Sequence, residues 1–108
     1  MNLPEIVKRL LHAQAKYDSI AYANCFTETA IVFDEEKSHI GKEAIKQWNE
    51  STNDEYHTQL EPIEFRPDYP KEILTVNVSG TFDGSPILLD YHFEIEKDLI
   101  STLKITLL

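Results

Sequence analysis

The chain has 108 residues and carries 10 Lys and Arg against 19 Asp and Glu, which gives a formal net charge of −9. This length corresponds to about one domain, and the hydrophobic fraction of 42% is sufficient for one core. Nucleic-acid binding needs clustered basic side chains that displace counterions from phosphates, and the basic residues here are few and scattered. The composition therefore argues against nucleic acid and against a polybasic membrane patch, and the negative charge favours solubility.

Cysteine content and hydropathy predict a cytoplasmic protein. Cys25 is the only cysteine, so no intrachain disulfide can form, which is typical of a reducing compartment. Residues 1–5 contain neither the basic segment nor the apolar run of a secretory signal. No stretch approaches the ~18 apolar residues of a membrane span.

Apolar periodicity predicts two helices at the start of the chain. Residues 3–15 carry Leu, Ile and Val at helical spacing. Asn2 and Glu5 have the spacing of a capping box that would start this helix. Residues 18–26 predict a second, shorter helix, and Asp18 is placed to cap it.

A short strand and a third helix are expected next. Residues 29–34 are β-branched and aromatic, and they predict a strand that ends at Asp34, before an exposed polar loop. Gly41 stands where a helix would begin, and the apolar side chains as far as Trp48 would form its inward face. The polar run 49–55 predicts the end of this helix.

The second half of the chain predicts four β-strands, over residues 56–66, 72–82, 85–96 and 99–107. Pro62 predicts a kink or bulge in the first of them, because proline cannot donate to the ladder. Asp83 and Gly84 predict a two-residue type I′ turn between the second and the third. Side chains alternate between an apolar and a polar face. The polar face, which includes Thr75 and Asn77, is expected to be solvated or to form a dimer interface.

Several stretches, spread over nearly the whole chain, share the pattern of one family. Residues 18–26 and 27–34 are similar to a short helix and the strand that follows it, and residues 41–48 to a helix that begins Gly-Arg-Glu-Ala-Ile. Residues 91–95 and 99–105 are similar to its last two strands. Through them the chain resembles the SnoaL-like branch of the nuclear-transport-factor-2-like superfamily. The resemblance implies a cystatin-like α+β cone, in which three N-terminal helices pack on a strongly bent, mostly antiparallel sheet and enclose a pocket. The superfamily includes ketosteroid isomerase, scytalone dehydratase, limonene epoxide hydrolase, polyketide cyclases and non-enzymatic members, so the fold does not give the function.

The resemblance places Asp34 at the position of the catalytic aspartate of ketosteroid isomerase. A carboxylate at a strand end that faces an apolar cavity can act as a general base, because desolvation raises its pKa. The alternative is an exposed residue that begins the acidic loop. The isomerase also needs a tyrosine, which falls near Leu10 here, with Tyr17 as a substitute only from the helix junction. Its late aspartate falls near Tyr91, which alternation points inward. The constellation is incomplete, so we do not expect that isomerase activity.

The histidines and the cysteine do not form a ligand set. His39 precedes the third helix and His57 begins a strand, so both are candidates for the mouth of the pocket, whereas His92 lies on a polar strand face. No two of the four histidines are separated by four residues, and Cys25 has no partner at ligand spacing. We expect Cys25 in the core, no metal site and no cofactor.

These patterns predict a single SnoaL-like domain over residues 1–108 that binds a small, largely apolar molecule in its cavity. The expected pocket residues are Tyr17, Tyr22, Phe26, Val32, His39, Trp48, His57, Tyr91 and Phe93, with Asp34 as the candidate catalytic residue. Two alternatives stay open: an isomerase, dehydratase or cyclase that uses Asp34 as general base, and a non-catalytic accessory or interaction domain whose cavity is filled by its own side chains. We expect a homodimer through the outer sheet face and neither nucleic acid nor membrane as a partner.

Overall fold

The computed structural model describes all 108 residues. The helices are α1 (Glu5–Ala15), α2 (Ser19–Ala23) and α3 (Lys42–Tyr56). The strands are β1 (Phe26–Asp34), β2 (Lys37–Ile40), β3 (Gln59–Asp68), β4 (Lys71–Ser79), β5 (Ile87–Glu96) and β6 (Leu99–Leu107). The predicted α+β class is confirmed. None of the helices has the length and apolar character needed to cross a membrane.

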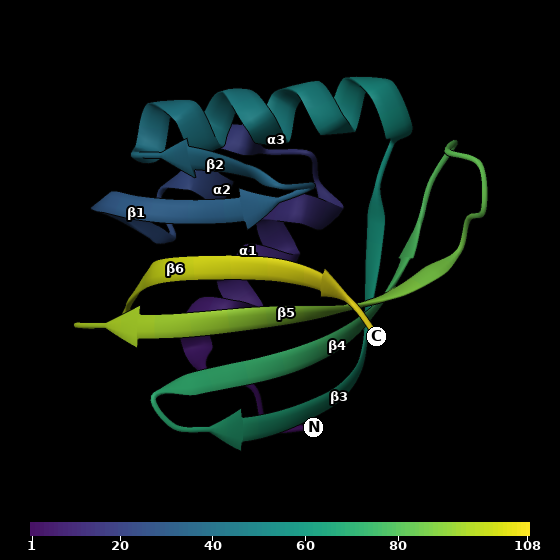
Figure 1. Cartoon of the computed structure of the whole chain (residues 1–108). Helices are drawn as coiled ribbons and strands as arrows, with labels where there is room; N and C mark the ends of the chain where they lie inside the picture. The colour runs from purple at the N-terminus through teal and green to yellow at the C-terminus, as the bar shows by residue number, and fades with distance from the viewer.

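The six strands form one sheet in the order β2-β1-β6-β5-β4-β3. The β1–β6 pair is parallel and the other four pairs are antiparallel, as expected for a mostly antiparallel sheet. Figure 1 shows α3 above β1 and β2, with α1 and α2 behind the sheet and β3 and β4 curving toward the end of α3. The helices therefore cover one face of the sheet and leave the other open.

The predicted helix starts agree with the structure in two cases of three, and one of these is α3, which begins at Lys42 with Gly41 at its N-cap. The side chain of Asp18 accepts a hydrogen bond from the Ala21 N–H at 3.0 Å, so the predicted cap of α2 is confirmed. The predicted capping box of α1 is wrong, because α1 begins at Glu5 with Pro4 at the N-cap and no side chain caps it. The carbonyl of Pro4 instead accepts the first backbone hydrogen bonds of the helix.

The end of α3 and the strand β2 were not expected. The helix does not stop at the polar run but continues to Tyr56, because Asn49 and Asn53 are buried against α1. Residues 35–38 were expected to form an exposed loop, but β2 begins within them, at Lys37, and pairs with β1. The two strands are joined by Glu35 and Glu36, both with positive φ, as a type I′ turn requires.

The β-rich half follows the prediction except at one turn. The ladder between β3 and β4 shifts register just after Pro62, which confirms the expected bulge. The prediction of a two-residue turn at Asp83 and Gly84 is wrong, because β4 ends at Ser79 and a longer loop, residues 80–86, leads to β5. A tertiary contact causes the difference: the Thr81 N–H donates to the carbonyl of Tyr56, at the end of α3, at 2.7 Å.

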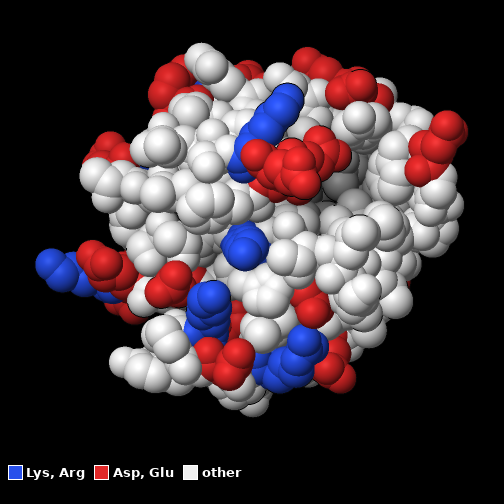
Figure 2. Space-filling model, in the orientation of Figure 1, with Lys and Arg blue, Asp and Glu red and all other residues white.

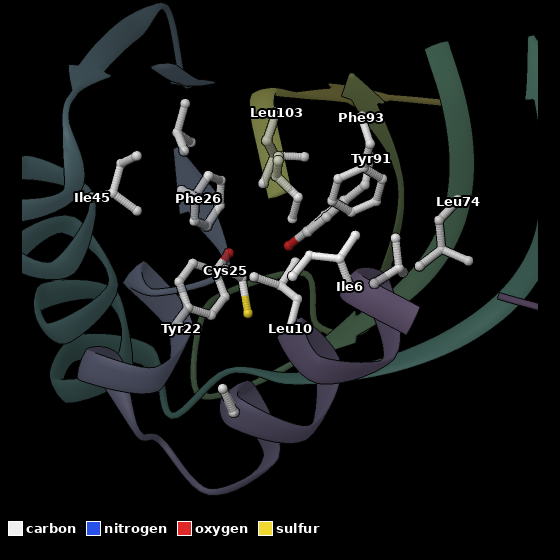
Figure 3. Packing of buried hydrophobic residues seen from close by; sticks show 14 of the residues in the cluster. Ile6, Leu10, Tyr22, Cys25, Phe26, Ile45, Leu74, Tyr91, Phe93 and Leu103 are labelled. Atoms are coloured by element: carbon white, nitrogen blue, oxygen red, sulfur yellow. The ribbon is translucent and has the colours of Figure 1, made fainter. Parts of the chain in front are cut away.

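The core fills the space between the inner sheet face and the helices (Figure 3). Phe26 and Val32 of β1, Ile45 of α3, Phe93 of β5 and Leu103 of β6 are fully buried there. Burying a large apolar side chain stabilises a fold by about 1.5–3 kcal/mol. The helix α3 lies against β1 and β2, at one edge of the sheet.

Candidate functional site

Beside the packed core, the helices and the sheet enclose a cavity of about 630 Å³. Twenty residues line it, and eleven of them are hydrophobic. Its apolar walls come mainly from the strands, through Leu60, Val78, Ile87, Leu89 and Ile105. This volume lies within the roughly 300–1,000 Å³ of small-molecule sites.

Two tyrosines place unpaired hydroxyl groups in the cavity. Tyr22 of α2 and Tyr91 of β5 are 1% and 6% exposed, and Figure 3 shows their hydroxyl oxygens pointing toward the same central region. Burial raises the pKa of both phenols, and the nearby charge of Asp34 raises it further. No hydrogen bond within the protein engages either hydroxyl. The two groups are therefore neutral donors that are free to bind a guest molecule.

Asp34 is the carboxylate nearest these phenols, at the end of β1, and its side chain lines the cavity. Burial is the main cause that raises its pKa, and the charge of Glu35 adds to it. Hydrogen bonding from the Trp48 side chain and the Glu35 backbone acts in the opposite direction. The four ion pairs of the chain leave Asp34 without a cation. A half-buried carboxylate thus meets the cavity with no charged partner.

The inner end of the cavity is closed by a ring of three buried amides. Gln14 Nε2 donates to Asn53 Oδ1 at 2.8 Å, Asn53 Nδ2 donates to Asn49 Oδ1 at 3.1 Å, and Asn49 Nδ2 donates to Gln14 Oε1 at 2.8 Å. Ser19 Oγ donates to Asn49 Oδ1 at 2.7 Å, and Gln14 Nε2 also donates to the carbonyl of Thr58. Each amide oxygen is satisfied, so the ring joins α1 to α3 at little energetic cost.

The mouth of the cavity lies between the β1–β2 turn and the β4–β5 loop. Tyr56 and Phe82 meet there edge to face, with ring centroids 5.9 Å apart. Gly80 permits this contact, because a Cβ at that position would clash with the carbonyl oxygen of Tyr56. Glu35, on the turn, and Asp83, on the loop, complete the rim. Figure 2 shows acidic side chains beside a hollow on this part of the surface.

Four of the ten residues predicted for the site line the cavity: Tyr22, Asp34, Trp48 and Tyr91. Phe26, Val32 and Phe93 do not line it, although they face inward as predicted. They are fully buried in the packed core, because β1, β5 and the helices approach too closely there to leave space.

The remaining three predicted residues lie outside the cavity lining. The Tyr17 hydroxyl accepts a hydrogen bond from Gln59 Nε2 at 2.6 Å on the surface. His57 is exposed and ends α3 in a left-handed conformation with φ 52°. His39 stacks on Trp48 from β2, with ring centroids 5.5 Å apart. Burial lowers the pKa of His39, and Lys37 lowers it further.

Residues that the sequence did not assign to the site include the amides Gln14 and Asn49. A signal for both was present. Gln14 continues the buried stripe of α1 at the spacing of Val7 and Leu10, and Asn49 lies four residues after the buried Ile45. A polar residue at an apolar helical position indicates either a buried network or a ligand contact.

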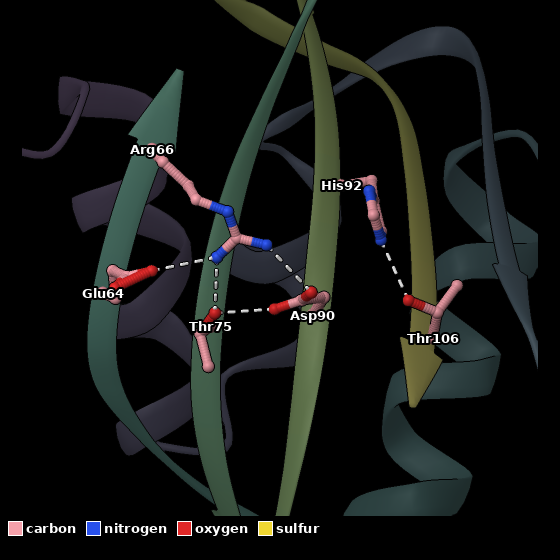
Figure 4. Close-up of polar contacts among 6 residues, drawn as sticks. All are labelled: Glu64, Arg66, Thr75, Asp90, His92 and Thr106. Atoms are coloured by element: carbon pink, nitrogen blue, oxygen red, sulfur yellow. Dashed lines mark hydrogen bonds and ion pairs between the residues drawn. The ribbon is translucent and has the colours of Figure 1, made fainter. Parts of the chain in front are cut away.

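The outer sheet face carries a separate polar cluster (Figure 4). Arg66 donates to Asp90 at 3.1 Å and to Thr75 at 3.0 Å, and the Thr75 hydroxyl donates to Asp90 at 2.6 Å. His92 lies on this face, as its alternation predicted, and is 2.9 Å from the Thr106 hydroxyl. Cys25 is free and buried, and burial raises the pKa of its thiol. No group of three or more His, Cys, Asp or Glu could hold a metal ion.

The chain is similar to several solved structures, although no family model matches it. A candidate polyketide cyclase from Sinorhizobium meliloti is 35% identical with a TM-score of 0.92, over 96% of this chain and 95% of its own. A protein with a ketosteroid isomerase-like fold from Catenulispora acidiphila, solved in complex with trimethylamine, is 15% identical with a TM-score of 0.85, over 96% and 85%. At this identity the likeness shows the fold alone.

Among curated proteins, the uncharacterized MG397 homolog of Mycoplasma pneumoniae is 28% identical over 82% of this chain. The chain spans only 14% of the length of that relative. The S. meliloti protein, by contrast, matches from end to end at an identity that shows common descent. The chain belongs to the SnoaL-like, polyketide cyclase-like branch of the nuclear-transport-factor-2-like superfamily.

Proposed function

We propose that the protein binds a small, largely apolar molecule in the cone-shaped cavity between its helices and its sheet. The observation that carries this proposal is a cavity of about 630 Å³ with largely apolar walls and three polar groups that are free to meet a ligand: two hydroxyls without a hydrogen-bond partner and a carboxylate without a cation. These groups are the hydroxyls of Tyr22 and Tyr91 and the carboxylate of Asp34. Binding sites for small molecules combine apolar walls with a few such polar groups.

Different parts of the cavity would contact different parts of a ligand. A carbonyl or hydroxyl oxygen that reaches the tyrosines would receive hydrogen bonds from neutral phenols. Asn49 has two amide protons, one of which is donated to Gln14, and the second is available at the inner end of the cavity. The apolar body of the ligand would contact Leu89 and Ile105 on the sheet.

A neutral fluorophore tests this function. N-phenyl-1-naphthylamine brightens in apolar pockets, and Trp48, the single tryptophan, lies in the cavity wall and can transfer excitation energy to it. We expect saturable binding with energy transfer from Trp48. The variant Leu89→Phe fills the cavity and should weaken binding at least about tenfold. Its matched control, Leu88→Phe, adds the same volume at an exposed position on the outer face and should bind like the wild type.

Two results would contradict the proposal. The first is an absence of saturable binding to the wild-type protein. The second is equal binding by the two phenylalanine variants, which would place the fluorophore on the surface. Leu89→Phe is informative only when folded, so near-ultraviolet circular dichroism must match that of Leu88→Phe.

General base catalysis is a second candidate function, favoured by the environment of Asp34. Its raised pKa makes it a stronger base than an exposed aspartate. Asp34 would take a proton from a carbon next to a carbonyl group, and the phenols of Tyr22 and Tyr91 would donate hydrogen bonds to the enolate oxygen that forms. This step is common to isomerases and to many cyclisations.

Hydrogen–deuterium exchange at the α carbons of 2-tetralone, followed by proton NMR in deuterated water, tests this candidate. We expect exchange above the buffer rate with the wild type, and a loss of at least about 100-fold in Asp34→Asn, because a general base contributes 10²–10⁴ in rate. Glu96→Gln removes one exposed carboxylate far from the cavity and should leave the rate unchanged. Equal rates for Asp34→Asn and the wild type would exclude Asp34 as the base.

A homodimer through the outer sheet face stays a proposal. The face has the polar cluster around Arg66 and Asp90, and neither helix nor loop covers it. Light scattering at micromolar concentration should give twice the chain mass of 12.5 kDa. A mass of one chain would exclude the dimer.

A further inference from the structure

The charged residues around the cavity all have the same sign. Asp34, Glu35, Glu36 and Asp83 belong to the twenty lining residues, and none of the twenty is Lys, Arg or His. Lys37 follows the β1–β2 turn but does not line the cavity. Walls of low dielectric focus the potential of such a rim, so it attracts cations and repels carboxylates and phosphates.

The carboxylate of Asp34 differs from the three rim residues, because it is partly removed from solvent. A buried or half-buried charge is ordinarily paired with a charge of opposite sign. No ion pair includes Asp34. The Trp48 side chain and the phenols of Tyr22 and Tyr91 near it are neutral, and the charge of the neighbouring Glu35 is also negative. General acidity of the surface accounts for Glu35, Glu36 and Asp83 but not for an unpaired carboxylate inside the cavity.

Aromatic side chains surround the same space. Trp48 and Tyr22 lie 6.1 Å apart between ring centroids, next to Asp34, and Tyr56 and Phe82 flank the mouth. Organic cations bind at aromatic faces, by about 0.5–2 kcal/mol for each favourable contact. Aromatic walls around an unpaired carboxylate are the chemical arrangement that recognises alkylated ammonium groups. Tyr91 is a buried residue whose hydroxyl lines the same cavity without a hydrogen-bond partner in the protein, and this is the independent sign that the space takes a ligand.

We propose that the ligand of the cavity is an organic cation: a small apolar molecule with an ammonium group that lies against Asp34 among the aromatic side chains. This proposal rests on the proposed binding function and gives its ligand class. The rim formed by Glu35, Glu36 and Asp83 raises the local concentration of the cation and excludes anions of equal size. An ammonium in this place would lower the pKa of Asp34, so a bound cation makes Asp34 a weaker base.

Two isosteric probes separate charge from shape. Phenyltrimethylammonium and tert-butylbenzene have the same size and differ in one positive charge. Titrations of ¹⁵N-labelled protein at low salt would follow the backbone amides of the cavity and the Trp48 indole N–H. We expect the cation to bind at least about tenfold more tightly than the neutral probe, from the combined Coulomb and aromatic contributions. The advantage should fall to about threefold or less in Asp34→Asn.

The control is Glu96→Gln, which changes the net charge by the same amount at the exposed β5–β6 turn and should keep the full advantage of the cation. Asp34→Asn should fold, because it removes an unpaired, desolvated charge while its amide oxygen can still accept a hydrogen bond. Equal binding of the two probes would overturn the proposal that the ligand is a cation and would leave the proposed binding function intact. An absence of shifts at cavity residues with both probes would overturn both. If the cationic probe still binds more tightly than the neutral probe to Asp34→Asn by the full factor, the cation binds at the outer rim and the proposed site at Asp34 is rejected.

Discussion

The space between the helices and the sheet has two parts: the packed core, which is the closed half, and the cavity, which is the open half. Neighbouring inward positions on the same strand belong to different halves. On β1, Val32 is fully buried in the core, whereas Asp34, the next residue on that face, lines the cavity. On β5, Phe93 is fully buried, whereas Tyr91 presents its hydroxyl to the cavity. Alternation therefore decides which face a side chain takes, and the position along the strand decides whether it packs or meets the cavity.

The polar groups around the cavity also differ, according to whether they have partners within the protein. In the amide ring, Gln14, Asn49 and Asn53 donate to one another and join two helices. The phenol of Tyr91 has no such partner, and the carboxylate of Asp34 has no partner of opposite charge. Groups that satisfy one another stabilise the fold, and groups left without a partner remain available to a ligand. Four substitutions test this distinction, from the largest expected effect to the smallest.

Phe93→Ala should have the largest effect on stability. Removing a fully buried phenyl ring from a close-packed core costs about 3–5 kcal/mol in the free energy of unfolding. Urea denaturation followed by circular dichroism measures this loss. The matched control is Phe33→Ala on β1, where the ring is 39% exposed and should contribute much less. Similar losses in the two variants would mean that the closed half is not the stabilising core.

Asn49→Ala should have the next largest effect, about 2–3 kcal/mol, because it leaves buried partners in Gln14 and Asn53 unsatisfied. Denaturation under the same conditions measures the loss. Gln47→Ala removes an exposed amide from the same helix and should change stability by less than about 0.5 kcal/mol. A change of that small size in Asn49→Ala would show that the ring does not hold α1 to α3.

Asp34→Asn should stabilise the protein at neutral pH, in contrast to the first two variants. The pKa of Asp34 is raised in the folded state above its ordinary value of 3.8, so the folded state binds this proton more tightly than the unfolded state. The contribution of Asp34 to stability is therefore favourable at low pH and is lost as the pH rises through the folded pKa. The stability advantage of Asp34→Asn should be full at pH 7 and shrink as the pH falls toward 3.8.

Thermal unfolding at several pH values measures this difference. Glu96→Gln, at an exposed position, should show no comparable gain at pH 7. An Asp34→Asn variant that is less stable than the wild type at pH 7 would show that the carboxylate is satisfied in the folded protein.

Tyr91→Phe should have the smallest effect on stability, within about 0.5 kcal/mol, because its hydroxyl has no hydrogen-bond partner in the protein. Its effect should fall on binding instead. A lost hydrogen bond of about 1 kcal/mol weakens a ligand that accepts from this hydroxyl about fivefold. Thermal unfolding and a binding titration with 2-tetralone, whose carbonyl is an acceptor, measure the two quantities. A large loss of stability with unchanged binding would reverse the assignment of Tyr91 to the open half.

Sequence patterns by themselves determined the class of fold and most of its elements. Periodicity located α1, the cap Asp18 located the start of α2, alternation assigned the faces of β5, and Pro62 marked the bulge in β3. The resemblance to the superfamily brought Asp34 and Tyr91 to the same site. These features depend on local spacing, which the amino-acid order contains directly.

Tertiary structure alone decided where the cavity lies and what surrounds it. The sequence predicts that the helix ends in the polar run that contains Asn49 and Asn53. In the structure the helix continues, because Gln14 of α1 forms hydrogen bonds with both residues. The sequence predicts a tight turn between β4 and β5. The structure has a longer loop there, because Thr81 forms a backbone hydrogen bond with Tyr56 at the end of α3. Phe93 and Tyr91 are equivalent inward positions in the sequence, and only the approach of the helices separates a core residue from a cavity residue. The distance between layers depends on contacts that are remote in the chain, so no local pattern contains it.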